Sequence, residues 1–164
     1  MDSQETMEYT KWITQAGLLL ALTLVIQMLG FPQFVTGPLV NMMLILSAFF
    51  VGGLGGSLIG GLTPWIAISR GILPPPLAPM IPFIIAGNIV LVLNYYFLQN
   101  KSKYLAIITG AAVKYAILTV GVRFLVDVPP KIAKMMQIPQ LLTALAGGFL
   151  ALFIIKFIKR ADIR

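Results

Sequence analysis

The glycine-rich stretch GGLGGSLIGG, residues 52–61, interrupts the long apolar run in the first half of the chain. No Asp, Glu, Lys or Arg occurs between Trp12 and Ser69, and a bilayer is the solvent that permits such a run. The part of this run that follows the first span, residues 38–69, is too long for one membrane span and short for two. We therefore predict a break between Gly52 and Gly56, flanked by two spans or by a bent or re-entrant pair.

The composition of the whole chain agrees with a membrane protein. Of its 164 residues, 59% are hydrophobic and only 10% are charged, whereas soluble domains are roughly a quarter charged. Because a span needs about 20 apolar residues, we predict one all-α integral membrane domain over residues 1–164, a bundle of six transmembrane helices. The expected spans are 12–29, 38–52, 53–69, 80–98, 104–126 and 139–158.

The distribution of basic residues indicates the orientation. Seven lie on the side that the two termini share and four on the opposite side, so the positive-inside rule predicts cytoplasmic termini. The three outer connections would be FPQFVTGP (31–38), RGILPPPLAP (70–79) and VDVPPKIAKMMQ (126–137), each with proline. Because proline fixes φ, the segment LPPPLAP (73–79) is expected to form a semi-rigid extended wall or lid.

Several classes of function are excluded by absent residues. The chain has no cysteine and no histidine, which removes thiol chemistry, the commonest metal ligand and the usual neutral-pH base. The glycine-rich stretch lacks the Gly-Lys-Ser/Thr ending of a nucleotide-binding loop. Basic residues are scattered and form no stripe for nucleic acid. We expect no metal, no cofactor bound by this chain and no nucleic-acid partner.

Lys114 is the clearest functional candidate. It lies near the middle of the fifth predicted span, on the same helical face as Gly110 and Leu118, and should point inward. No other span contains a carboxylate that could pair with it. Its counter-ion is therefore either a bound ligand or, alternatively, helix carbonyl groups such as those around Asn88.

Four further polar residues complete the predicted binding site. Asn41, Asn88 and Gln140 lie in the outer halves of their spans, where a pocket under the proline-containing loops would form. Arg70 ends the third span, so the stiff loop after it could present its guanidinium to a carboxylate or phosphate, although snorkelling to lipid phosphate is equally common. Three cations, Arg70, Lys114 and Arg123, belong to the outer or central part of the bundle, and together they predict an anionic ligand.

Small residues at four-residue spacing form possible packing ridges. Gly52, Gly56 and Gly60 make one, and Gly17 and Ala21 make another. Small residues let helices approach closely in lipid, so internal packing is the simpler interpretation of each ridge.

The chain resembles the substrate-binding S components of energy-coupling factor (ECF) transporters, the bacterial vitamin uptake systems. The resemblance rests on six spans in a chain of this small size, the Gly17 and Ala21 pair, and a glycine-rich second and third span. It rests also on the segments TGPLVNMMLIL (36–46) and PQLLTALAGGFLALFI (139–154). It implies a multi-pass protein of the bacterial cytoplasmic membrane that captures a vitamin-like molecule from outside. A T component, contacted through Gly17 and Ala21, and two ATPases that use ATP would complete the importer.

Two other classes of function remain open at this stage. The first is a self-sufficient small channel or carrier that assembles as an oligomer, against which stands the lack of carboxylates within the spans. The second is a membrane enzyme acting on lipid headgroups. Without histidine, cysteine or paired carboxylates, the chain offers a poor set of acid and base groups, so we expect that it is not an enzyme.

Overall fold

The computed structural model describes residues 3–161, and all regular structure in that range is helical. Five stretches within it are long and apolar enough to cross a membrane. The long helices are α1 (Ser3–Met28), α2 (Gln33–Ser69), α3 (Ile81–Leu98), α4 (Lys103–Val120) and α6 (Ile138–Ala161). The short elements are the 3₁₀ helix η1 (Pro75–Met80), the π-helical turn η2 (Gly121–Leu125) and α5 (Pro130–Met135).

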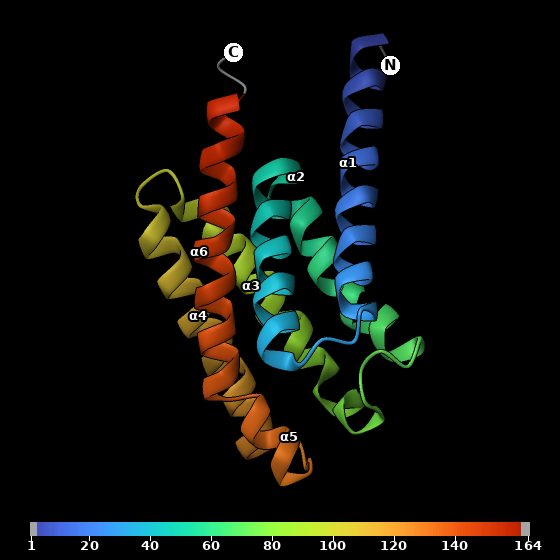
Figure 1. Ribbon diagram of the computed structural model, residues 1–164, viewed down its shortest axis with the longest axis vertical. Helices are drawn as coiled ribbons and strands as arrows, with labels where there is room; N and C mark the ends of the chain where they lie inside the picture. The colour runs from blue at the N-terminus through green and yellow to red at the C-terminus, as the bar shows by residue number, and fades with distance from the viewer. Residues whose placement is uncertain (1–2, 162–164) are drawn as a thin grey trace.

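Helix α2 folds back on itself at Gly52, which has φ 76° and ψ −176°. A Cβ added to Gly56 would lie 3.0 Å from the backbone N of Ala48, and one added to Gly60 would lie 3.5 Å from Leu44 Cδ2. In a straight helix residues 44 and 60 would be about 24 Å apart. Figure 1 shows the two arms of α2, residues 33–51 and 53–69, side by side and antiparallel.

The fold-back lies at Gly52, the first residue of the range 52–56 in which the sequence predicts a break. The expected segments 38–52 and 53–69 correspond to the two arms of α2, although the first arm begins earlier, at Gln33. The six expected segments therefore occupy five long helices. Only glycine readily adopts the backbone conformation found at Gly52. The carbonyl of Val51, next to the break, accepts a hydrogen bond of 2.9 Å from Trp12 Nε1 of α1. This bond attaches α1 to the bend.

Two helix boundaries and the conformation of one segment differ from the sequence-based expectation. Helix α1 is described from Ser3, not from Trp12, and includes the charged residues Glu5, Glu8 and Lys11. Helix α2 begins at Gln33, so most of the predicted first outer loop is helical. The segment 75–80 is a 3₁₀ helix and not an extended wall, because the φ that proline imposes suits either conformation.

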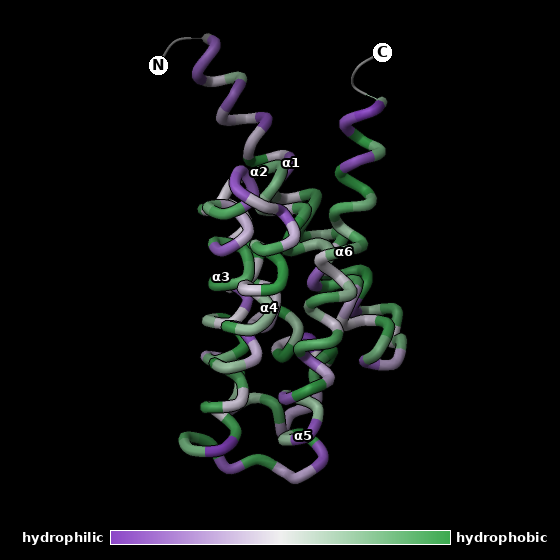
Figure 2. The backbone as a smooth tube through the Cα atoms, turned by 90° about the vertical axis from the view of Figure 1, so that its left-hand side faces the viewer, coloured by the Kyte–Doolittle hydropathy of each residue, from purple (hydrophilic) through white to green (hydrophobic). Residues whose placement is uncertain are grey.

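Helix α2 lies at the centre of the bundle and packs against α1, α3 and α6, while α4 packs against α3 and α6. The main core contains fully buried side chains from four helices, among them Leu44, Leu91, Ile107 and Ile155. The tube in Figure 2 is hydrophobic through most of the bundle and hydrophilic near the start of α1. The exposed apolar residues on the sides of the bundle therefore suit a lipid environment.

The two ends of the bundle differ. The start of α1 and the end of α6 lie at one end, and α5 lies at the other (Figure 1). At the α5 end, a second small core of Leu77, Met80, Leu118, Ile132 and Met136 joins the connecting segments to α4. These segments are thus packed onto the helices.

Candidate functional site

Lys114 is buried inside the bundle within a cluster of three polar side chains. Its Nζ donates hydrogen bonds to Asn41 Oδ1 at 2.6 Å and to Asn88 Oδ1 at 2.8 Å. All three residues are at most 4% exposed. Asn41 lies on the first arm of α2, Asn88 on α3 and Lys114 on α4, so this Lys–Asn cluster joins three helices.

The two asparagine side chains are held with their oxygens toward Lys114. Asn41 Nδ2 donates to the carbonyl of Gly37 at 2.9 Å, and Asn88 Nδ2 donates to the carbonyl of Gly60 at 3.0 Å. With each amide nitrogen engaged by a carbonyl, each amide oxygen is left to accept from the lysine. The helix backbone therefore fixes the geometry of the cluster.

Three glycines make room for the cluster. A Cβ added to Gly87 would lie 3.0 Å from Lys114 Cγ, and one added to Gly60 would lie 3.1 Å from Asn88 Cβ. A Cβ on Gly147 would come within 2.8 Å of the Cβ of Asn41. Small residues at these points let the helices approach closely enough for the side chains to meet.

The ammonium group of Lys114 has no carboxylate partner among residues 3–161. The acidic residues that the structure describes, Glu5, Glu8 and Asp127, are all exposed. Burial of an ion costs several kcal/mol, and each hydrogen bond from a charged donor returns about 1.5–3 kcal/mol. Two such bonds offset much of that cost, but they leave the positive charge of the ammonium without a negative partner. They also leave one of its three N–H groups without an acceptor among the described residues.

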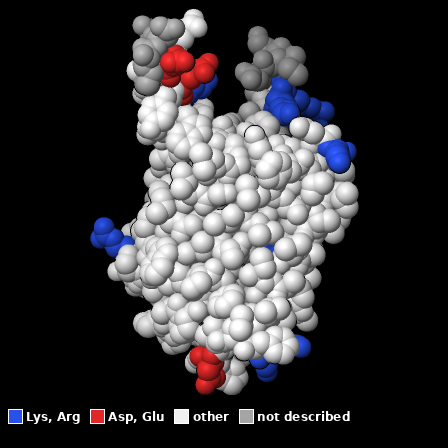
Figure 3. Space-filling view, turned by 180° about the vertical axis from the view of Figure 1, so that it is seen from behind, with Lys and Arg blue, Asp and Glu red and all other residues white. Residues whose placement is uncertain are grey.

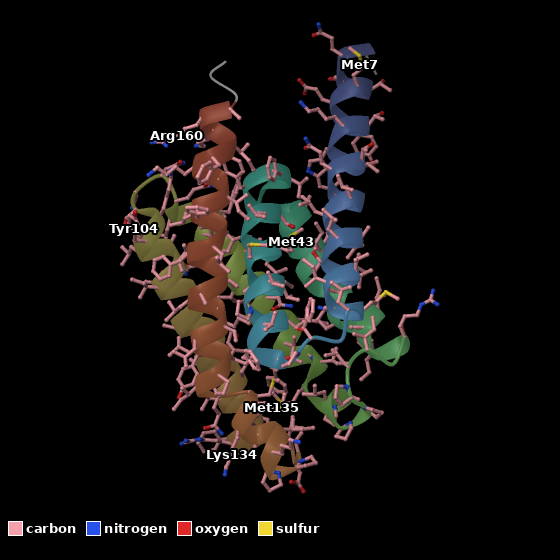
Figure 4. The ribbon with its side chains drawn as sticks, viewed as in Figure 1. Met7, Met43, Tyr104, Lys134, Met135 and Arg160 are labelled. Carbon is pink, nitrogen blue, oxygen red and sulfur yellow. The ribbon has the colours of Figure 1, made fainter. Side chains whose placement is uncertain are left out.

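The Lys–Asn cluster lies in the wall of a cavity of about 360 Å³ at the α5 end of the bundle. Apolar side chains form most of the remaining wall, and they come from both arms of α2, from α3, from the connections and from α5. Met135 of α5, labelled in Figure 4, is one of them. Others are Val40, Pro64, Ile72, Leu73, Leu77, Ile84 and Met136. The cavity thus combines one charged group with a mainly apolar surface, as small-molecule sites do.

Four of the five predicted site residues line this cavity. Asn41, Asn88 and Lys114 form the cluster, and Gln140, near the start of α6, also faces the cavity. Arg70 does not. It follows the last residue of α2, is exposed, and donates its backbone N–H to the carbonyl of Ile66. The segment after it supplies Ile72, Leu73, Pro74 and Leu77 to the wall, so the predicted loop is present at the cavity although its arginine is not.

The sequence did not single out four further polar residues of the wall, which are Gln27, Gln33, Thr36 and Thr63. Two of them are buried or have a buried polar atom. Thr63, on the second arm of α2, is buried and donates its hydroxyl to the carbonyl of Ile59 at 2.6 Å. Gln27, near the end of α1, has a buried Oε1 without a hydrogen-bond donor among the described residues. Both are polar residues within otherwise apolar helices, which is the signal that could have identified them.

The ridge formed by Gly17 and Ala21 is exposed, unlike the ridge formed by Gly52, Gly56 and Gly60. Gly52, Gly56 and Gly60 belong to the internal packing of α2, with Val92 and Asn88 as neighbours of the last two. Gly17 and Ala21 are exposed on α1, and no other group lies within 4 Å of a Cβ added to Gly17. This pair therefore lies on an open face of the protein.

A family profile described as "ECF transporter, substrate-specific component" matches residues 11–159, most of the chain. The chain belongs to this family. It is therefore the substrate-specific subunit, or S component, of a transporter and not an enzyme, and transporters of this family use ATP through partner ATPases. The chain matches no curated protein sequence and no solved structure.

Proposed function

We propose that this S component captures a small, vitamin-like anion in the cavity at the α5 end of the bundle. The observation that carries the proposal is the buried ammonium of Lys114, which has two neutral acceptors and no carboxylate among the described residues. A carboxylate or phosphate oxygen in the cavity would accept from its remaining N–H. A charge-assisted hydrogen bond in such a poorly solvated site is stronger than the same bond in water.

The other polar groups of the cavity would determine which anion fits. Gln27 Oε1 can accept an N–H or O–H from the ligand, and Gln140 can donate or accept. The apolar wall would enclose an uncharged body of the ligand between these groups. A molecule with an anionic end, an apolar middle and a hydrogen-bond donor would satisfy all of them.

The proposal includes an orientation in the membrane. The two arms of α2 each cross the bilayer, which gives six spans in the bacterial cytoplasmic membrane. Both termini are cytoplasmic and the cavity opens outward, in agreement with the excess of basic residues on the termini side. A T component, bound at Gly17 and Ala21, and two ATPases then deliver the ligand to the cytoplasm.

Mass spectrometry of the molecules released on denaturation tests the proposal. The protein is purified in mild detergent from its native host or from a rich-medium host, beside Lys114→Met and Lys134→Met variants. Lys134 is exposed on α5 and does not line the cavity. We expect a stoichiometric anion from the wild type and the Lys134 variant but not from the Lys114 variant. ATP-independent flux of that anion through the purified chain in liposomes would instead support a self-sufficient carrier.

A further inference from the structure

A second cavity, of about 400 Å³, lies at the end of the bundle opposite the Lys–Asn cluster cavity. It is a groove between the first turn of α4 and the last turns of α6, and we call it the basic groove. Its lining residues are Lys103, Tyr104, Leu152, Ile155, Lys156, Lys159 and Arg160. Four of the seven are cationic, and none of them is a carboxylate.

The positive charge of the basic groove is not neutralised by the described acidic residues. Glu5 and Glu8 lie on α1, a separate helix at this end of the molecule, and Asp127 lies near the other end. Figure 3 shows several basic side chains near the end of α6, apart from the acidic ones near the start of α1. In a poorly screened setting near a membrane surface, each such cation attracts anionic headgroups.

The groove also has an apolar side. Ile155 is buried, Leu152 is half-buried, and the ring of Tyr104 lies 6.4 Å from that of the exposed Phe149. Lys159 is held over the ring of Phe49, with its Nζ 5.2 Å from the centroid. Figure 4 shows Tyr104 and Arg160 at this end of the bundle and Lys134 at the other.

We propose that the basic groove binds the headgroup of an anionic phospholipid. The phosphate would lie among Lys103, Lys156 and Arg160, and the first part of an acyl chain would pass along Leu152 toward the exposed apolar face of α6. Free phosphate would satisfy the cations but not this apolar surface, which is why we assign the groove to a lipid. The N-terminal end of α4 adds the positive end of a helix dipole to the same site.

Lipid titration of the purified protein in an uncharged detergent tests this inference. The midpoint of thermal unfolding is followed as dioleoylphosphatidylglycerol, dioleoylphosphatidylcholine or inorganic phosphate is added. The wild type is compared with Lys103→Gln/Lys156→Gln and with a matched control, Lys131→Gln/Lys134→Gln, which removes two cations from α5 at the opposite end. All four lysines are exposed.

We expect phosphatidylglycerol to raise the unfolding midpoint of the wild type and of the control, and phosphatidylcholine to have little effect. Loss of two groove cations should weaken the apparent affinity for phosphatidylglycerol on the order of 30-fold. Equal responses of the two double variants would overturn the inference, as would an equal response to inorganic phosphate. Each single variant, Lys103→Gln and Lys156→Gln, should show part of the loss. Such a graded loss would show that misfolding of the double variant is not its cause.

Discussion

Lys114 and Asn41 lie 73 residues apart in the sequence, and Lys114 Nζ donates a hydrogen bond of 2.6 Å to Asn41 Oδ1 inside the bundle. This bond connects α4 with the first arm of α2, and both residues line the same cavity. The charge at this point of the wall is carried by Lys114, and its position depends on a residue from the other half of the chain. A substitution at either residue changes the electrostatic potential that a ligand meets.

Replacement of Lys114 by methionine should weaken ligand binding about 10- to 100-fold, because one charge-assisted hydrogen bond to the ligand is lost. The measurement is isothermal titration with the anion identified by mass spectrometry. Methionine has a similar length and leaves the apolar packing around the side chain in place. Unchanged affinity in the folded variant would remove Lys114 from the ligand site.

Substitution of Asn41 by aspartate tests charge separately from shape. The new carboxylate would have nearly the same size, would pair with Lys114 and would cancel its positive charge. We expect the variant to lose the co-purified anion, whereas Asn41→Ser, which is neutral, should retain part of it. The two variants are compared by the amount of anion released on denaturation per mole of protein. Full occupancy in the aspartate variant would contradict an electrostatic role for Lys114.

Replacement of Gly87 by alanine should reduce ligand affinity about tenfold, because the new methyl group displaces Lys114. The added Cβ would lie 3.0 Å from Lys114 Cγ, so the lysine stem must shift and its hydrogen bonds to the asparagines must change. Gly61→Ala is the matched control, because its Cβ would meet nothing closer than 3.8 Å. Equal affinities of the two variants, measured by the same titration, would show that Gly87 does not position the lysine.

Leucine at Gly17 or Ala21 should prevent co-purification of the T component without affecting ligand binding. Both positions are exposed on α1, so a larger side chain disturbs a partner surface and not the interior. Ala112→Leu, a similar change at an exposed position of α4, serves as the control. Loss of ligand binding together with the partner would indicate misfolding of the variant instead.

Alanine at Gly52 should lower the free energy of unfolding by about 1–3 kcal/mol, because the side chain must adopt a backbone conformation that only glycine tolerates. Gly17→Ala, at a helical position with open space around it, should have no such cost and can stabilise α1 slightly. Unfolding in mixed micelles with increasing sodium dodecyl sulfate measures both. A Gly52 variant as stable as the wild type would show that the bend is not confined to this residue.

The candidate site could be predicted only in part. A lysine in an apolar span must face inward, and Asn41, Asn88 and Gln140 stood out because polar groups are costly in a membrane. Arg70 was expected at the site for a separate reason, the stiff proline-containing loop after it. That loop lines the cavity, whereas Arg70 is exposed and does not line it.

The sequence by itself indicated the membrane class, the main apolar helices and a break between Gly52 and Gly56. Those properties depend on local hydrophobicity and on backbone freedom, which each residue carries with it. Tertiary structure alone decided that Asn41 and Asn88 are the acceptors for Lys114 and that Gly87 admits the lysine stem. Such contacts depend on how the helices pack against one another, and no short stretch of the chain encodes that arrangement.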